Sequence, residues 1–316
     1  MEKIQVAVIG SGYLGKFHAE KYAHHPEAEL IAVVDNNYSR AVELADQTNS
    51  KPFINYSDLY DQVQAVSIVV PTHLHYTIAK DFLEHDINVL LEKPMTTTLK
   101  EADELIAIAH ARNLILQIGY LERFNPAYRA AEGMVKNPLF IESHRLNSFQ
   151  ERGTEVDVIL DIMIHDIDII LSLVDAEVKE IHAVGVPVIS SMIDIANARL
   201  EFENGCVVNA TASRISYKSM RKIRIFQHDA YISIDFATQE VSVYRKIEDE
   251  GRLPYIVSKK LEIESKDSLE EEIKSFLKAV KQKSTPPVSG EAGIRALKVA
   301  LEIANQLRID TQRIVG

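Results

Sequence analysis

A polar stripe crosses an otherwise apolar segment, LDIMIHDIDIIL, at residues 160–171. If the segment is helical, each residue turns by about 100°, and Asp161, His165, Asp168 and Ser172 fall on one side. Such a stripe on a buried helix lowers stability unless its groups are paired or used. A histidine with a pKa near ~6.5 suits a general base, and an acid one turn earlier can orient that base or a substrate. The spacing therefore predicts a helix whose polar stripe is either paired with other groups or used in chemistry.

The other two acids of this segment are expected to serve the structure. Asp168 is predicted to form a hydrogen bond or salt bridge to a sheet in the second half of the chain, and Asp166 to cap or pair at the surface. A metal ion held by Asp161, His165 and Asp168 is the alternative, because histidine and carboxylates are common metal ligands. Proton transfer by His165 needs no metal, and none is predicted.

Three glycines near the N-terminus form a second candidate site. The stretch VAVIGSGYLGKFHAEKY sets Gly10, Gly12 and Gly15 in the pattern G-x-G-x-x-G, between an apolar run and a helical one. In this context Gly10 permits a tight turn, Gly12 lets the backbone approach a pyrophosphate, and Gly15 lets helix and strand pack closely. The alternative is a glycine-rich turn in another α/β fold. The pattern predicts a dinucleotide site.

The next apolar run, LIAVVD, ends in an acid that indicates which dinucleotide binds. Asp35 can accept hydrogen bonds from the adenosine ribose hydroxyls, and its charge would repel a 2′-phosphate. We therefore predict NAD rather than NADP. Arg40 weakens this preference if it lies beside the ribose.

Two further stretches, VVPTHLHY and LLEKPMTT, each follow a strand-like run. Ligands of open α/β sheets bind outside the carboxyl ends of the strands, so both stretches are expected at the cofactor edge. Lys93 precedes a proline, which disfavours helical backbone at Lys93, and its ammonium can stabilise a developing alkoxide. A lysine after a strand is more often a surface residue. The predicted cofactor contacts are Gly10, Gly12, Tyr13, Leu14, Gly15, Asp35, Asn36, Arg40, Pro71, Thr72, His75, Glu92 and Lys93.

The elements that must position these residues follow two different patterns. In the first part, apolar runs such as IQVAVI and AVSIVV alternate with stretches of helical spacing, which implies a parallel sheet covered on both faces. Later segments such as IANARLEFE and EVSVYR alternate apolar and polar residues, which is typical of a sheet with one covered face. We expect a Rossmann α/β domain at residues 1–122 and an α+β domain with a large, mainly antiparallel open sheet at residues 123–316.

The end of the chain and the large sheet carry two further expectations. Two amphipathic helices close the chain, the last near residues 289–309 with Ser289 as its cap, and this helix can pack back on the first domain. The open sheet needs cover on its second face, which predicts a homodimer or homotetramer.

The composition limits the classes of partner that the protein is expected to bind. The 316 residues carry a net charge of −11, which gives no bulk attraction for nucleic acid or an anionic membrane. No apolar run approaches the roughly 20 residues of a membrane helix, and no signal peptide is apparent, so a cytoplasmic protein is expected. The lone Cys206 excludes an internal disulfide. The basic stretch at residues 213–224 is expected to be a solvated strand face, with an anion site as the alternative.

The motifs GSGYLG, EKP and the D-x-x-x-H of LDIMIHDID, in this order, resemble the glucose–fructose oxidoreductase and inositol dehydrogenase family (Gfo/Idh/MocA). The resemblance covers essentially the whole chain. It implies an NAD(P)-dependent dehydrogenase that acts on CH–OH groups, with Lys93 near the nicotinamide and the reacting hydroxyl. It also implies that Asp161 and His165 are the catalytic pair, and that the sheet of the second domain pairs subunits.

The resemblance also implies where a substrate binds. The segment GYLERFNPAYRA enters the second domain in this family, which makes Tyr120, Arg123 and Asn125 candidate pocket residues. The alternative is a helix start with Asn125 as cap and Pro126 at the first helical position. The segments ERFNPA and SFQERGTEVDVILD resemble the corresponding segments of family members that oxidise C3 of UDP-N-acetylglucosamine. This similarity makes Arg123 and Arg152 candidate phosphate or sugar contacts. The predicted substrate contacts are Tyr120, Arg123, Asn125, Arg152, Asp161 and His165.

Two rival functions stay open. The first is a dehydrogenase of a free polyol such as inositol or glucose. The second is a regulator that binds the dinucleotide without catalysis, for which Lys93, Asp161 and His165 would have no use.

Overall fold

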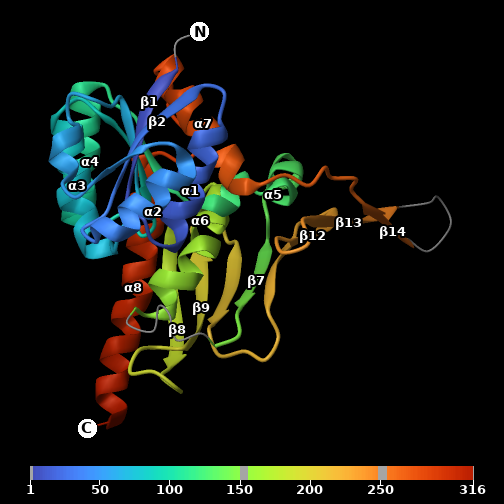
Figure 1. Cartoon of the computed structure of the whole chain (residues 1–316). Helices are drawn as coiled ribbons and strands as arrows, with labels where there is room; N and C mark the ends of the chain where they lie inside the picture. Colours follow the sequence, from blue (N-terminus) through green and yellow to red (C-terminus); the bar gives the residue numbers. More distant parts are fainter. Residues whose placement is uncertain (1–2, 150–155, 248–254, 316) are drawn as a thin grey trace. The chain divides into compact units, whose positions relative to one another are not determined.

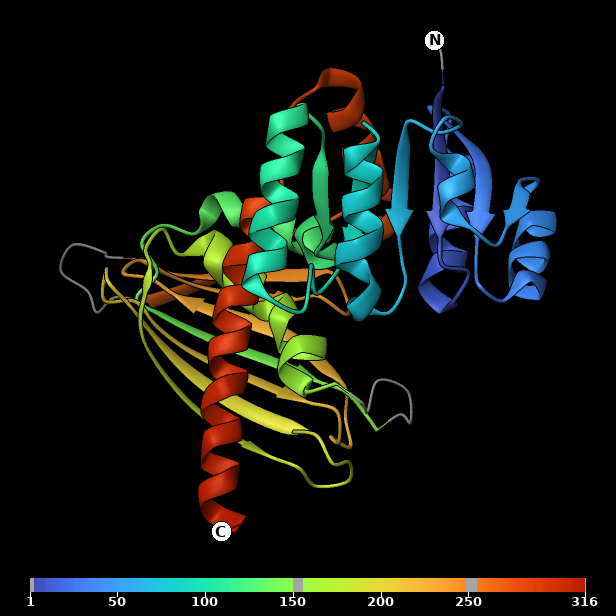
Figure 2. The same cartoon turned by 90° about the vertical axis from the view of Figure 1, so that its left-hand side faces the viewer.

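The chain divides into two compact units, each with its own sheet. The computed structural model describes residues 3–149, 156–247 and 255–315, with the backbone alone for 308–315. The first unit comprises Met1–Leu121 and Asp267–Ile294, and the second comprises Glu122–Lys266 and Arg295–Gly316. Figures 1 and 2 show the two sheets, blue to green for the first and green to orange for the second.

The first unit is built on a six-stranded sheet in the order β3-β2-β1-β4-β5-β6, in which every pairing is parallel. The strand order reverses between β1 and β4, and such a switch point opens a crevice for ligands at the carboxyl ends of the strands. The strands are β1 (Ile4–Ile9), β2 (Ala28–Val34), β3 (Lys51–Phe53), β4 (Ala65–Ile68), β5 (Asn88–Glu92) and β6 (Leu116–Gly119).

Helices cover both faces of this sheet. Figure 1 shows α3 and α4 on the side opposite α1 and α7. Thr98 and Glu101 form a reciprocal capping box at the start of α4, and Asn113 in the left-handed region ends it. The helices are α1 (Tyr13–His24), α2 (Tyr38–Thr48), α3 (His75–Glu84), α4 (Leu99–Arg112) and α7 (Ser268–Gln282).

Helix α7 belongs to the first unit although it lies far along the chain. Its side chains Ile273, Phe276 and Leu277 are almost fully buried in one cluster with Val6 and Tyr22. The division expected at residues 122/123 left α7 with the second domain. The structure assigns it to the first because its apolar face completes the cover of the parallel sheet.

The second unit is built on an eight-stranded sheet in the order β14-β13-β12-β11-β7-β10-β9-β8. Among the strand pairs of the described residues only β7–β10 is parallel, so the sheet is mainly antiparallel as predicted. Its strands are β7 (Phe140–Leu146), β8 (Val178–Val186), β9 (Ile195–Phe202), β10 (Val207–Ser213), β11 (Met220–Phe226), β12 (Ala230–Asp235), β13 (Glu240–Ile247) and β14 (Tyr255–Lys260).

Short helices lie along one face of the second sheet (Figure 2). They are α5 (Pro126–Ala131), the π-helical turn η5 (Ile159–Met163) and α6 (Ile164–Leu173). Helix α8 (Gly290–Val315) closes the chain, and Gln306 donates to the main-chain carbonyl of Ile181 at the edge strand β8. None of the helices in the described ranges is long and apolar enough to cross a membrane.

Candidate active site

The turn between β1 and α1 admits only glycine at two of the three glycine positions of the G-x-G-x-x-G pattern. Gly10 has φ +103°, and a Cβ there would lie 2.3 Å from the carbonyl oxygen of Val69. A Cβ on Gly15 would lie 1.8 Å from the carbonyl oxygen of Gly10. Both contacts are shorter than any van der Waals distance. The geometry matches the tight turn and the close helix–strand packing expected for these residues.

Gly12 differs from Gly10 and Gly15 because a side chain at this position would enter open space. It is the N-cap residue of α1, and a Cβ there would meet no atom of the described chain within 4 Å. A helix N-terminus with an open approach favours an anion, because its first N–H groups and the helix dipole both point outward. This cradle fits the pyrophosphate of a dinucleotide.

A cavity of about 940 Å³ adjoins the glycine turn. At its rim, Asp35 accepts hydrogen bonds from the N–H groups of Ser11 and Asn37, both at 2.8 Å. These bonds fix the carboxylate at the end of β2, and Arg40 also lines the cavity. The volume is in the range that holds a cofactor fragment. The predicted contacts that line it are Gly10, Gly12, Asp35, Asn36, Arg40 and Pro71.

The rest of the predicted cofactor set lies elsewhere in the first unit. Tyr13 and Leu14 are exposed in the first turn of α1, and Thr72 begins the 3-10 turn η2 (Thr72–Leu74). His75 is fully buried, and its two ring nitrogens contact the carbonyl oxygens of Val70 and Pro94 at 2.8 and 2.9 Å. Burial lowers the pKa of His75 despite these carbonyls. A structural role, joining the two loops, fits His75 better than contact with a cofactor.

Several residues that line the cavity were not predicted from the sequence. Ile54 and Leu74 line it although both are substantially exposed, and Tyr56 and Tyr60 line it from the 3-10 turn η1 (Tyr56–Leu59) and the residue after it. Exposed apolar side chains at a cavity rim are suited to the face of a nucleobase. The available signal was the aromatic stretch NYSDLY after the short strand β3, which is too short to stand out as a strand.

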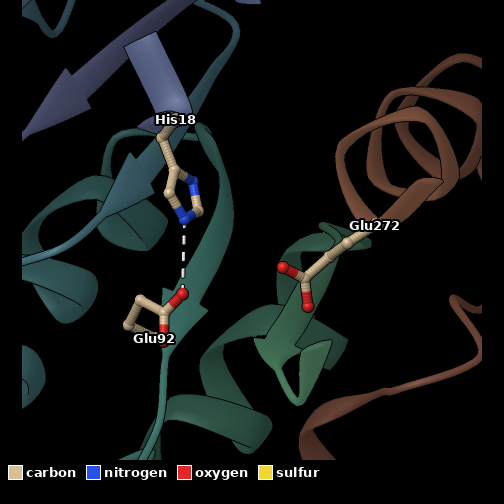
Figure 3. Close-up of side chains that lie close together, drawn as sticks. All are labelled: His18, Glu92 and Glu272. Carbon is tan, nitrogen blue, oxygen red and sulfur yellow. Dashed lines mark hydrogen bonds and ion pairs between the residues drawn. The ribbon is translucent and has the colours of Figure 1, made fainter. Parts of the chain in front are cut away.

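Lys93 follows directly on β5, and its main chain is tied to the preceding acid. Glu92 accepts a hydrogen bond from the N–H of Lys93 at 3.2 Å through Oε2, and its Oε1 lies 3.3 Å from His18 Nε2 (Figure 3). Burial raises the pKa of Glu92, but the bonds from His18 and the nearby Lys93 outweigh burial and lower the pKa overall. Glu92 is therefore an ionised group that holds the backbone of Lys93.

In the second unit, Asp161 lies in the π-helical turn η5 and His165 in the first turn of α6. The predicted helix is confirmed, with the difference that its first turn is π-helical. Such turns are rare and often occur at functional sites. Asp161 and His165 are both partly exposed, whereas Ile162, Met163 and Ile164 between them are buried. The stripe therefore leaves both reactive groups accessible.

Of the two remaining acids of this helix, Asp166 takes the pairing with the sheet that was expected of Asp168, and neither acid lies at the surface. Asp166 is not at the surface: it is 2% exposed and accepts from Arg145 Nε at 2.7 Å and from Ser143. It is Asp166 that pairs with the sheet, because the helix turns this face toward β7. Asp168 is also buried and lies 3.9 Å from Arg123 instead. Burial raises the pKa of Asp168 to about 7, and Arg123 only partly offsets this effect.

The predicted substrate residues have varied surroundings. Asn125 caps α5 by accepting from the N–H of Ala127, and its amide donates to Glu122 and to the carbonyl of Phe236, which bears out the helix-start interpretation. The ring of Tyr120 is buried. Arg123 lies over the ring of Tyr128 at 5.5 Å, beside Asp168. Arg152 lies outside the described residues.

Much of the basic stretch at residues 213–224 is paired within the second unit. Arg224 pairs with Glu142 at 2.8 Å and Lys222 with Asp235 at 3.7 Å. Arg214 is buried and donates to the carbonyl oxygens of Val156 and Ile193. These pairs favour the interpretation as a strand face over an anion site.

Within the described ranges, one group of three histidine or acid side chains has ligand atoms within 4.8 Å of one another, and it consists of His18, Glu92 and Glu272. The stripe of Asp161, His165 and Asp168 forms no such group there. The alternative of a metal ion on α6 therefore has no geometric support.

Comparison with known families gives matches in both units. Residues 4–120 match the oxidoreductase family with the NAD-binding Rossmann fold, and residues 129–233 match the Gfo/Idh/MocA C-terminal domain. The chain is similar to UDP-N-acetylglucosamine 3-dehydrogenase of Acidithiobacillus ferrooxidans, with 36% identity over 315 residues that cover 99% of this chain and 100% of the relative. It is also similar to myo-inositol 2-dehydrogenase of Thermotoga maritima, at 28% identity over 93% of both chains.

Solved structures agree with these matches. The A. ferrooxidans UDP-N-acetylglucosamine 3-dehydrogenase superposes with a TM-score of 0.91 at 35% identity, covering 97% of this chain and 98% of that one. A scyllo-inositol dehydrogenase of Lactobacillus casei superposes with a TM-score of 0.82 at 19% identity, covering 98% and 97%. The second similarity supports the fold alone.

Proposed function

Because the chain belongs to the Gfo/Idh/MocA family of NAD-binding oxidoreductases, we propose that it oxidises the C3 hydroxyl of UDP-N-acetylglucosamine to the 3-keto sugar nucleotide. Its relatives are sugar and polyol dehydrogenases, and the chain is a dehydrogenase of CH–OH groups. The observation that carries the choice of substrate is the 36% identity to a UDP-N-acetylglucosamine 3-dehydrogenase along the full length of both chains.

Lys93, His165 and Asp161 are the proposed catalytic residues. Bound NAD supplies the acceptor for the hydride that leaves the alcohol carbon. His165 takes the hydroxyl proton as general base, since an imidazole is largely neutral at pH 7. The ammonium of Lys93 stabilises the negative charge that develops on the oxygen. Asp161, four residues before His165, orients the base or the sugar. A regulator without catalysis has no use for these three groups.

An assay of NADH formation with a panel of substrates tests this function. UDP-N-acetylglucosamine is expected to give a kcat/KM at least about 100-fold above that of myo-inositol or glucose, because the site must reject substrates that lack the nucleotide. The same UDP-sugar should raise the Tm in the presence of NAD, whereas the polyols should not. Faster turnover of a polyol would assign the chain to the inositol dehydrogenases, and no turnover with bound NAD would favour the regulator.

The cofactor preference gives a separate prediction. We expect kcat/KM for NAD to exceed that for NADP by about tenfold or more, because the carboxylate of Asp35 repels a 2′-phosphate. Asp35→Ser should lower kcat/KM for NAD and raise it for NADP. Asp46→Ser, on the exposed face of α2, is the matched control and should leave the ratio unchanged. Equal activity of the wild type with both cofactors would contradict the proposal.

The outer face of the second sheet is the proposed contact between two copies of the chain. Aromatic rings stack across four neighbouring strands, with centroids 5.6, 4.7 and 5.0 Å apart along Phe140, Phe226, Tyr231 and Tyr244. Half-buried aromatic rings in a row are suited to a further layer. Sedimentation equilibrium would refute this proposal if the chain stayed monomeric at micromolar concentration. The expected cytoplasmic location stays a prediction.

A further inference from the structure

Three titratable side chains of the first unit lie close together, and one of them is Glu92, the residue before Lys93. They come from three separate elements: His18 from α1, Glu92 from the end of β5 and Glu272 from α7. Figure 3 shows their polar ends pointing toward one another, and their ligand atoms lie within 4.8 Å. His18 and Glu272 are 1% and 0% exposed. The proposed reaction uses Glu92 only as a support for Lys93, so Glu272 has no assigned role.

The two acids of this cluster have very different surroundings. Glu92 faces His18 through one oxygen and accepts the N–H of Lys93 through the other. Both carboxyl oxygens of Glu272 are buried without a hydrogen-bond partner in the residues that the structure describes. A buried carboxylate without donors is costly, whereas a carboxylic acid is much less so.

The two acids of the cluster share one imidazole neighbour. His18 Nε2 lies 3.3 Å from Glu92 Oε1, and Glu272 adds a second carboxyl group whose ligand atom lies within 4.8 Å of both. Two neutral groups lie beside the cluster: Tyr22 of α1 bonds to Ser67, and Gln117 of β6 donates to the main-chain carbonyl of Glu272, while Lys93 acts with its positive charge on Glu92. Burial and the charge of Glu92 raise the pKa of Glu272 well above its usual value. When two carboxyls share one site, one keeps its proton.

We propose that Glu272 is a positioning residue that stays a neutral carboxylic acid, so that Glu92 remains ionised between His18 and the backbone of Lys93. An ionised Glu272 would repel Glu92 and loosen its bond to the Lys93 N–H. This inference rests on the catalytic role proposed for Lys93, whereas the protonation of Glu272 can be tested without it.

Thermal unfolding across pH tests the protonation. A folded-state pKa above the unfolded value of ~4.3 means that folding takes up a proton, so the wild type loses stability as pH rises through the folded pKa. Gln cannot ionise and carries the same shape. The Tm of Glu272→Gln minus that of the wild type should therefore increase between about pH 5 and pH 8. Glu271→Gln, one residue away on α7 and half-exposed, should give a constant difference. A constant deficit for Glu272→Gln would overturn the proposal.

Kinetics test the positioning. Glu272→Gln should keep kcat within about threefold of the wild type and stay active at alkaline pH where the wild type declines. Glu272→Leu is also neutral, so it should likewise keep kcat within about threefold and stay active at alkaline pH, with the KM for NAD unchanged. Equal losses in Gln and Leu would show that the carboxylate form is needed. So would a stoichiometric divalent metal, measured by mass spectrometry, that binds the wild type and is lost in Glu272→Gln.

One comparison separates this inference from the proposed mechanism. If Lys93→Ala retained wild-type turnover, the role of Lys93 and the positioning role of Glu272 would both fail. The dependence of Tm on pH would still report whether Glu272 holds a proton, because unfolding does not involve the reaction.

Discussion

Alanine in place of Lys93 or His165 is expected to lower kcat by about 10²- to 10⁴-fold. Lys93→Ala removes the positive charge that faces the developing alkoxide, and His165→Ala removes the group that accepts its proton. Binding of NAD should persist in both variants, because the glycine turn and Asp35 are untouched. NADH formation at saturating substrate measures kcat, and a fluorescence titration measures the Kd for NAD.

Matched variants show whether these losses are specific. Lys100→Ala, on the exposed start of α4, and His182→Ala, whose side chain is 63% exposed on β8, should leave kcat unchanged. Asp161→Asn keeps the size and the polarity but removes the charge, so an intermediate loss is expected if Asp161 orients the base. A kcat within threefold of the wild type in Lys93→Ala or His165→Ala would remove that residue from the catalytic set.

Local patterns made the first unit and the helix of the stripe predictable from sequence. The runs of Val and Ile in β1, β2 and β4 indicate strands that are buried on both faces. The glycine spacing indicates a turn that other residues cannot form. The four-residue spacing of Asp161 and His165 likewise fixes one helix face. Each of these signals lies within a few residues of the feature that it describes.

The buried polar residues of strand β7 could not be predicted from local sequence patterns. This strand lies in the middle of the second sheet, yet its sequence, FIESHRL, directs Ser143 and Arg145 into the covered face. An alternation with polar residues inside does not indicate a buried strand. The partners that make it possible, Glu122 and Asp166, are more than 20 residues away in both directions. Asp166 was expected at the surface for the same reason, because its partner Arg145 is not visible in its neighbourhood.

The buried charges of this unit give the second large effect, a loss of stability in Arg145→Met. The guanidinium is 5% exposed in its side chain and donates to Glu122 Oε1 and Asp166 Oδ1, both at 2.7 Å. Removing it leaves two carboxylates in a buried site without their cation. Breaking a buried ion pair in this way costs about 3–5 kcal/mol of folding free energy. The remaining carboxylates are buried without a compensating charge, and this penalty exceeds the net stabilisation that the intact pair provided.

Arg224→Met is the matched control for this prediction. Arg224 lies on the neighbouring strand β11 and pairs with Glu142 at 2.8 Å, but the two side chains are 39% and 31% exposed. Water and salt screen such a pair, so its loss should cost about 0–1 kcal/mol. Urea unfolding of both variants measures the difference, with circular dichroism following the sheet.

A triple variant separates the stranded charges from the lost packing. Arg145→Met combined with Glu122→Gln and Asp166→Asn removes the cation and both anions together, and it should recover more than half of the loss seen in Arg145→Met. If the triple variant were as unstable as the single one, the packing of Arg145 over the ring of Phe236, at 5.6 Å, would account for the loss. Recovery would instead show that β7 can occupy the centre of the sheet only because its inward arginine is neutralised from both flanking segments.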